Sequence, residues 1–177
     1  MRIGIDISQI VHEGTGVATY VRRIVATLVQ TYPEHEYILF GASLRKRNLF
    51  FEYLRTLPTR VRLIAVTIPP TLLDVLWNRL HVAPVEWFTG PLDIFWSSDW
   101  TQPPLVHARG ITTIHDLSIL RYPKESFGQI VAIQKRRLQR AKNVCQMFFC
   151  DSEATKKDAE ELLGIDQAAL EVVYPGL

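Results

Sequence analysis

The chain has 177 residues, of which 47% are hydrophobic and 21% charged, with a formal net charge of +2. This length and composition are typical of one globular domain with a sizeable core, and they exclude a disordered chain. The near-neutral charge predicts no nucleic-acid partner, and no apolar run is long enough to span a bilayer. The chain enters a strand without the apolar segment of a signal peptide, so we expect a cytoplasmic protein.

Residues 3–7 form a short apolar run of strand length, and a polar loop that ends in Gly14-Thr15-Gly16 follows it. Over residues 17–30 apolar side chains recur every three or four positions, which predicts an amphipathic helix that starts at the glycines. The unpaired N–H groups and the dipole at a helix N-terminus suit a phosphate, and Gly16 has no Cβ to keep a ligand away. On the glycines alone, a tight turn without a ligand fits equally well.

The rest of the chain alternates between strand-like and helical patterns. Further strands are predicted at residues 36–40 (stopped by Gly41), 60–67, 93–97, 111–114, 146–150 and 171–174. Between them we predict helices from Ser43 to Leu57 with Leu44 facing inward, from Thr71 to Leu80, from Pro84 to Gly90, over about residues 127–143, and from Glu153 to Leu163 with Ser152 as N-cap. Such alternation predicts an α/β fold, a Rossmann-like doubly wound parallel sheet of about seven strands in the order 3-2-1-4-5-6 with the seventh beyond.

Polar residues follow four of the predicted strands at their carboxyl ends: Asp6, then Ser98-Asp99, His115-Asp116 and Asp151-Ser152. In an open α/β sheet this edge binds the ligand, in the crevice where the strand order reverses. Here the reversal lies between strands one and four, beside the glycine turn, and His115 is the main candidate for chemistry there. Structural roles are the alternatives: His115 ordering its loop, Asp116 capping a turn and Asp6 binding backbone N–H groups.

Two further patterns bear on partners and location. The basic residues of the helix near 127–143 form a face that we expect to be solvated, with phosphate or an acidic membrane surface as the alternative partner: Lys135, Arg136, Arg137, Arg140 and Lys142. Cys145 and Cys150 lie five residues apart in one strand, so we expect them on opposite faces, roughly 16 Å apart and unable to bridge each other. Both are therefore predicted to be reduced core residues of a cytosolic protein.

Several cofactor-binding motifs are absent. Thr19 stands where a nicotinamide-binding motif has its third glycine, and no acidic residue ends the second strand. No Gly-Lys-Ser/Thr triplet of a Walker loop occurs, and the five histidines and two cysteines lack metal-site spacing. We therefore expect neither a resident cofactor nor a metal.

Taken together, the motifs resemble those of the N-terminal half of glycosyltransferase family 4, and they occur in the order of that family. They are Asp6, Gly14-Thr15-Gly16-Val17-Ala18-Thr19-Tyr20, Thr113-Ile114-His115-Asp116-Leu117, Tyr122-Pro123-Lys124-Glu125, Asp151-Ser152-Glu153 and Val172-Val173-Tyr174-Pro175-Gly176. The resemblance covers nearly the whole chain. It implies a GT-B fold, in which two Rossmann-like domains face each other across a cleft. It also implies retaining transfer of a sugar, such as mannose or glucose, from a nucleotide diphosphate to a hydroxyl acceptor in glycan or polysaccharide biosynthesis.

The resemblance also assigns roles to the polar edge. His115 would contact the transferred sugar, with Asp116 beside it, and would help by position and electrostatics rather than as general base. The acceptor proton would pass to the departing phosphate oxygen. The donor-phosphate residues would be Gly14, Thr15 and Gly16, and the acceptor-side residues Asp6, Ser98 and Asp99.

Residues 1–174 would then form the acceptor-side domain, and residues 175–177 would begin the crossover to a C-terminal domain that holds the nucleotide. We expect the 177-residue chain to transfer no sugar by itself. The expected partners are that missing domain, the nucleotide sugar and a glycan or lipid-linked acceptor, with peripheral association at the inner face of a membrane left open. A non-catalytic nucleotide-sugar or glycan binding module and an interaction domain with a vestigial cleft remain alternatives.

Overall fold

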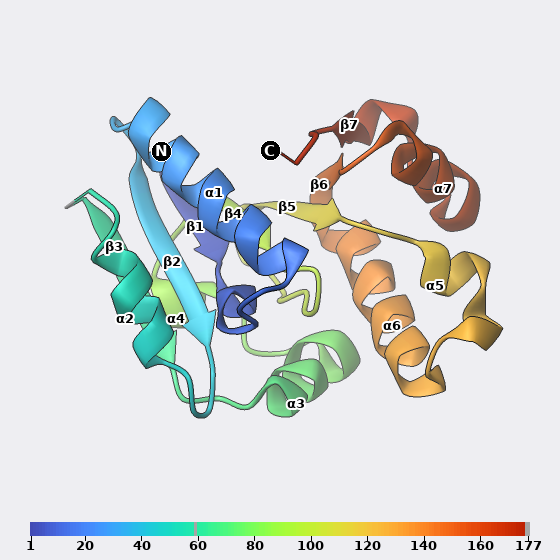
Figure 1. The fold of residues 1–177 in the computed structure, drawn as a ribbon, viewed down its shortest axis with the longest axis horizontal. Helices are drawn as coiled ribbons and strands as arrows, with labels where there is room; N and C mark the ends of the chain where they lie inside the picture. The colour runs from blue at the N-terminus through green and yellow to red at the C-terminus, as the bar shows by residue number, and fades with distance from the viewer. Residues whose placement is uncertain (59, 176–177) are drawn as a thin grey trace.

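The computed structural model describes residues 1–58 and 60–175, and one parallel sheet runs through this part of the chain (Figure 1). Its seven strands pair in the order β3-β2-β1-β4-β5-β6-β7, which confirms the predicted order. They are β1 (Arg2–Asp6), β2 (Glu36–Ala42), β3 (Val61–Val66), β4 (Ile94–Ser97), β5 (Arg109–Ile114), β6 (Cys145–Cys150) and β7 (Leu170–Val172). The order reverses between β1 and β4, which pair directly, so this fold places its crevice at the carboxyl ends of those two strands.

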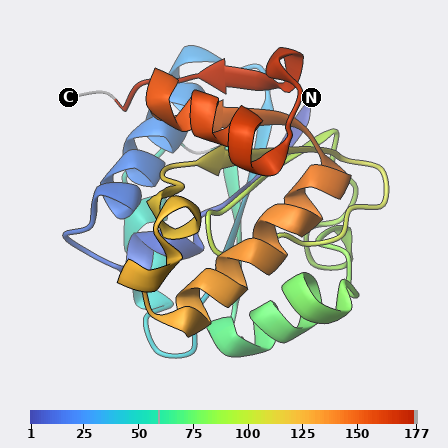
Figure 2. The same cartoon turned by 90° about the vertical axis from the view of Figure 1, so that its right-hand side faces the viewer.

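Helical segments connect the strands and cover the sheet (Figure 1, Figure 2). They are η1 (Ser8–Val11), α1 (Gly16–Thr31), α2 (Asn48–Leu54), α3 (Pro70–Leu73), η2 (Asp74–Leu80), α4 (Glu86–Thr89), α5 (Ser118–Arg121), η3 (Pro123–Glu125), α6 (Gly128–Val144), α7 (Glu153–Leu163) and η4 (Gln167–Ala169). Among the described residues, no helix combines the length and the apolar character that crossing a membrane would require.

Helix α1 takes its place because its apolar residues share one stripe. Val21, Val25 and Val29 are buried against the sheet, in the same cluster as Ile5 of β1. Complete burial of a valine or isoleucine side chain contributes about 1.5–3 kcal/mol, so this stripe holds the helix firmly. As a result, the N-terminus of α1 is fixed beside the carboxyl end of β1.

The opposite face of the sheet packs against α3, η2 and α4. Trp77 of η2 is fully buried, and its ring lies 5.4 Å from that of Phe40 in β2. Phe88 of α4 contacts both of these rings edge-on. A further apolar cluster packs α6 and α7 against β5, β6 and β7, through residues such as Leu138 and Ala159. The sheet is therefore covered on both faces, as the alternating pattern predicts.

Three local predictions around the end of β2 are wrong. The strand continues through Gly41 to Ala42, because both residues pair with β3, at Ala65 and Val66. The Phe50 ring lies 2.9 Å from the place that a Cβ of residue 41 would occupy, so glycine fits there. The following helix begins at Asn48 rather than Ser43, whose hydroxyl accepts a hydrogen bond from the Lys46 N–H and closes a turn. Leu44, predicted to face inward, is 51% exposed.

The prediction of a solvated basic face on α6 is wrong for Arg137, which is only 2% exposed. Its guanidinium donates to the carbonyls of Ser98 and Thr113, both at 3.0 Å, and to the Thr112 hydroxyl. Arg140 also binds protein, through hydrogen bonds to two carbonyl groups of η2. This helix therefore uses part of its charge to hold other elements in place.

The two cysteines are free, buried and close to one apolar cluster, which confirms that both are reduced core residues. Their expected placement on opposite faces is wrong. Cys145 pairs with Gly110 and Met147 with Ile111, so Gln146 is an extra residue in the strand and changes the alternation. Burial raises the pKa of Cys145 to about 12 and that of Cys150 to about 11.

Candidate functional site

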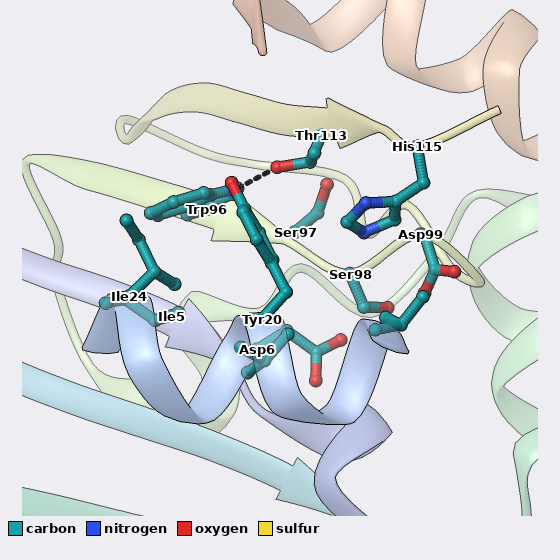
Figure 3. Close-up of a pocket in the computed structure, with 12 residues that line it drawn as sticks. Ile5, Asp6, Tyr20, Ile24, Trp96, Ser97, Ser98, Asp99, Thr113 and His115 are labelled. Carbon is teal, nitrogen blue, oxygen red and sulfur yellow. Dashed lines mark hydrogen bonds between the residues drawn. The ribbon is translucent and has the colours of Figure 1, made fainter. Parts of the chain in front are cut away.

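Side chains from four elements meet at the carboxyl edge of the sheet (Figure 3). Asp6 ends β1, Ser98 and Asp99 follow β4, and His115 follows β5. Tyr20 of α1 reaches into the space between them. Together they line a small cavity of about 20 Å³, which suits one water-sized group. The structure therefore brings these four sequence-predicted residues to one place, at the reversal of strand order.

His115 is held by a carboxylate and an aromatic ring. Its Nδ1 atom lies 2.7 Å from an Asp151 carboxylate oxygen, and both side chains are about one-fifth exposed, at 17% and 21%. The Tyr20 ring packs edge-on against the imidazole at 5.1 Å, and the carbonyl of His115 accepts a hydrogen bond from Thr155. Since a carboxylate only accepts hydrogen bonds, Nδ1 carries the proton, and Nε2 is left for another partner.

Two carboxylates at the cavity have oxygen atoms without a partner. Asp6 is 2% exposed, and its Oδ1 atom accepts the Ser8 N–H at 2.8 Å. Its Oδ2 atom and the Oδ1 atom of Asp99 have no hydrogen-bond partner in the described part of the protein. Burial raises the pKa of Asp6, and the nearby charge of Asp99 raises it further. Polar groups buried without partners cost free energy, so this edge is suited to a hydroxyl-bearing ligand.

The glycine turn presents the N-terminus of α1. Gly14 has a φ of +81°, which glycine adopts without strain, and the Thr15 side chain accepts a hydrogen bond from the Ala18 N–H at 3.2 Å. A Cβ atom added at Gly16 would meet no atom within 4 Å, so the space in front of the first turn is open. The structure thus supplies a capped helix end with free approach, as phosphate binding requires.

Asp116 is not part of this group. Its two carboxylate oxygens accept hydrogen bonds from the Ser118 N–H and the Ser118 hydroxyl, each at 2.6 Å. It is exposed and closes the turn that leads into α5. The capping role that the sequence left open for this residue is therefore the one that the contacts support.

Helix α6 holds the loop that carries Ser98 and Asp99. Arg137 donates to the Ser98 carbonyl and Gln134 to the Asp99 carbonyl, at 3.0 and 2.9 Å. The sequence indicated no role for Gln134, or for Asp151 as the partner of His115. Asp151 does, however, follow β6, the strand next to β5. That position was the one available signal, because the carboxyl ends of neighbouring parallel strands lie at the same edge.

Two larger hollows flank the start of α1. The first, which we call the apolar pocket, has a volume of about 610 Å³ and reaches from η1 and the loop after β2 to Ser98 and Asp99. The second, the α1 groove, has a volume of about 780 Å³ and lies between the glycine turn, α1 and Tyr174-Pro175. Thr15 lines both hollows, so one helix end could contact ligands on either side. The expected crossover continues into residues 176–177, which lie outside the described residues.

A comparison with protein-family models gives a match for this chain. No curated protein matches the chain. The model of Glycosyltransferase Family 4 matches residues 14–177, a range that begins in the glycine turn and includes His115, Asp151 and Tyr174. This match agrees with the seven-stranded parallel sheet. The chain therefore belongs to glycosyltransferase family 4, with the Rossmann-like fold of a GT-B N-terminal domain.

Proposed function

We propose that this chain is the acceptor-side half of a retaining glycosyltransferase. In this reaction a hexose moves from a nucleotide diphosphate to a hydroxyl group of an acceptor in glycan or polysaccharide assembly. The observation that carries the proposal is the convergence of an open helix N-terminus, an oriented histidine and two carboxylates at one edge of the sheet. Membership of glycosyltransferase family 4 supports the reaction class.

The glycine turn would bind the donor diphosphate. Its open approach at Gly16 lets phosphate oxygens reach the unpaired N–H groups of the first turn of α1. As the sugar–phosphate bond breaks, negative charge grows on the departing oxygen, and the partial positive charge of the helix end stabilises it. The groove between α1 and Tyr174-Pro175 gives the donor room on this side.

His115 would orient the donor sugar. Asp151 holds its Nδ1–H, so the Nε2 atom can accept a hydrogen bond from a sugar hydroxyl. The bond from the anomeric carbon to the phosphate oxygen breaks, and a bond from that carbon to the acceptor oxygen forms on the same face of the sugar. The acceptor proton passes to the departing phosphate oxygen, so no side chain has to act as general base. Asp6 and Asp99 have free carboxylate oxygens to position the acceptor.

The nucleotide would be held by a second Rossmann-like domain, because GT-B enzymes bind their substrates between two such halves. We therefore expect the 177-residue chain to fold but to need that domain for transfer. The test compares the purified chain with a polypeptide in which the chain continues into a GT-B C-terminal half. Each is incubated with a panel of labelled nucleotide sugars and hydroxyl acceptors.

Transfer by the longer polypeptide and none by the shorter chain is the expected result. Robust transfer by the purified 177-residue chain would contradict the proposal that transfer needs both domains. Binding of nucleotide sugars without any transfer, even by the longer polypeptide, would instead support a binding module of the same fold.

A further inference from the structure

Three consecutive carbonyl groups in the loop after β4 accept hydrogen bonds from side chains of other elements. The pairs are Ser98 with Arg137, Asp99 with Gln134 and Trp100 with Asn78, at 3.0, 2.9 and 3.1 Å. Two of the donors belong to α6 and the third to η2. Because each carbonyl has a separate donor, the loss of one donor would leave the other two carbonyls bonded. Each peptide group of this loop therefore depends on a different side chain.

Asn78 is itself held in place by η2, which winds as a π-helix. The wide turn of such a helix lets the fourth and the fifth residue after Asp74 both reach its carboxylate, through Asn78 Nδ2 and Arg79 Nε, each at 3.0 Å. Asn78 is only 1% exposed, and its Oδ1 atom accepts the Gln102 N–H at 3.0 Å. Since Nδ2 also donates to the Trp100 carbonyl, both amide hydrogens of Asn78 are used. This end of the loop is therefore firmly fixed.

Gln134 holds the residue of the loop that has a free carboxylate oxygen. Its side chain is half-buried, and its one hydrogen bond in the described part of the chain goes to the Asp99 carbonyl. The Oδ1 atom of Asp99 has no partner there, and Asp99 borders the same small cavity as His115 (Figure 3). The orientation of a peptide group sets the direction in which its side chain leaves the backbone. The Gln134 contact therefore sets where the Asp99 carboxylate lies relative to His115.

From these contacts we infer that Gln134 is a positioning residue of the transfer reaction and that it acts through Asp99. The inference rests on the proposed function, because it concerns the carboxylate that positions the acceptor there. Arg137 and Asn78 fix the neighbouring peptide groups, so the Gln134 hydrogen bond decides the orientation of the one between them. Preorganisation of this kind matters for rate, because a reacting group misplaced by about 1 Å can cost roughly a hundredfold.

The first measurement is amide hydrogen exchange of the 177-residue chain, read by mass spectrometry without any substrate. Gln134→Met keeps the length and the helix propensity of the side chain but removes the donor. We expect exchange in residues 98–102 to become about threefold faster, with exchange in α1 unchanged. Gln139→Met is the matched control, because Gln139 is exposed on the same helix and forms no hydrogen bond within the described part of the chain. Unchanged exchange of the loop in Gln134→Met would overturn the inference.

The second measurement is steady-state transfer by the longer polypeptide. In Gln134→Met we expect kcat/KM for the acceptor to fall about tenfold, while the KM for the donor stays within about twofold of the parent. The donor is spared because the side chain of Gln134 bonds neither α1 nor the glycine turn. A loss of stability alone would reduce the amount of active enzyme and leave both KM values unchanged. Gln139→Met should match the parent in all of these constants.

A double-mutant cycle tests whether Gln134 acts through Asp99. Asp99→Ala removes the carboxylate, so adding Gln134→Met to it should change kcat/KM by less than about twofold. A further tenfold loss in that background would overturn the inference, as would parent-like kinetics in Gln134→Met, and both results would leave the proposed function intact. If the parent polypeptide transfers no sugar, the proposed function itself fails, and the inference that rests on it fails with it.

Discussion

The Nδ1 atom of His115 lies 2.7 Å from the carboxylate of Asp151, although 36 residues separate the two in the sequence. The contact joins the ends of two neighbouring strands, β5 and β6. It fixes both the orientation of the imidazole and the nitrogen that carries the proton. A histidine that only closed a loop would not need to have its tautomer set by a carboxylate, so the pair leads to predictions about turnover as well as stability.

Replacement of His115 by alanine should lower turnover about a hundredfold in the transfer-competent polypeptide. Loss of one preorganised group at a site of developing charge typically costs ~3 kcal/mol in the transition state. The free energy of unfolding should fall by only about 1 kcal/mol, as for a lost hydrogen bond. Steady-state transfer and a thermal melt measure the two effects. His107→Ala is the control, because His107 is exposed just before β5, at the amino edge of the sheet. Near-normal turnover in a folded His115→Ala variant would indicate that His115 has only a structural role.

Asp151→Asn should slow turnover because the amide can present a donor to Nδ1 and favour the wrong tautomer. We expect a loss of about tenfold, smaller than that of His115→Ala. In a double-mutant cycle, adding Asp151→Asn to His115→Ala should change the rate by less than about twofold, because both act through one imidazole. The Ser152 cap of α7 is unaffected by this change, so the melting temperature should stay close to that of the parent. Additive losses in the cycle would mean that Asp151 acts independently.

The two glycines of the turn should respond differently to alanine. Gly14→Ala should destabilise the protein by about 1 kcal/mol or more, because its φ of +81° is strained for any residue with a Cβ. Gly16→Ala should leave stability unchanged or slightly higher, since its Cβ meets no atom within 4 Å. That same Cβ occupies the phosphate approach, so the KM for the donor should rise. Thermal melts measure the stability of both variants, and donor titrations measure their KM. Equal donor use by the parent and Gly16→Ala would favour a turn that binds nothing.

The buried Asp6 should make stability depend on pH. Its pKa is raised by burial, so the folded state binds the proton more tightly than the unfolded state does. Stability should therefore fall as pH rises from about 4, the ordinary value for aspartate, through the higher folded pKa. Asp6→Asn, which keeps an acceptor for the Ser8 N–H, should lack this loss.

Urea unfolding of both proteins between about pH 4 and pH 7 measures the effect. The free energy of unfolding of Asp6→Asn relative to the parent should increase across this range. Glu171→Gln is the control, because Glu171 is exposed on β7 and should show no such trend. If the parent instead gains stability over the variant as pH rises, the ionised carboxylate of Asp6 has a favourable partner.

The main elements could be predicted because their signals are local, and the strand order because the connection rules of parallel α/β sheets allow few arrangements. The apolar stripe of α1 and the Ser152 cap of α7 depend on neighbours within a few residues. The residues of the site could be predicted as a set because parallel strands place their carboxyl ends together. The structure confirms that Asp6, Ser98, Asp99 and His115 share one cavity.

What could not be predicted depends on distant partners. Arg137 looks like any solvated basic residue of a helix, because the carbonyls that receive its guanidinium lie 24 and 39 residues away. Gly41 looks like a strand end, because nothing nearby shows that the Phe50 ring will lie against it. The extra residue at Gln146 leaves no signal in the spacing of the cysteines. In each case the deciding contact is tertiary.

The hydrogen bonds from α6 to the Ser98–Asp99 loop have a consequence for the synthesis of the protein. A ribosome produces β1 to β4 and this loop well before it produces Gln134 and Arg137, which hold the loop's carbonyls. The carboxylate that orients His115 is made later still, at Asp151. A nascent chain that ends before Gln134 therefore has the strands of the crevice but none of these contacts. The residues that complete the cleft are therefore made after the strands β1 and β4 that carry it.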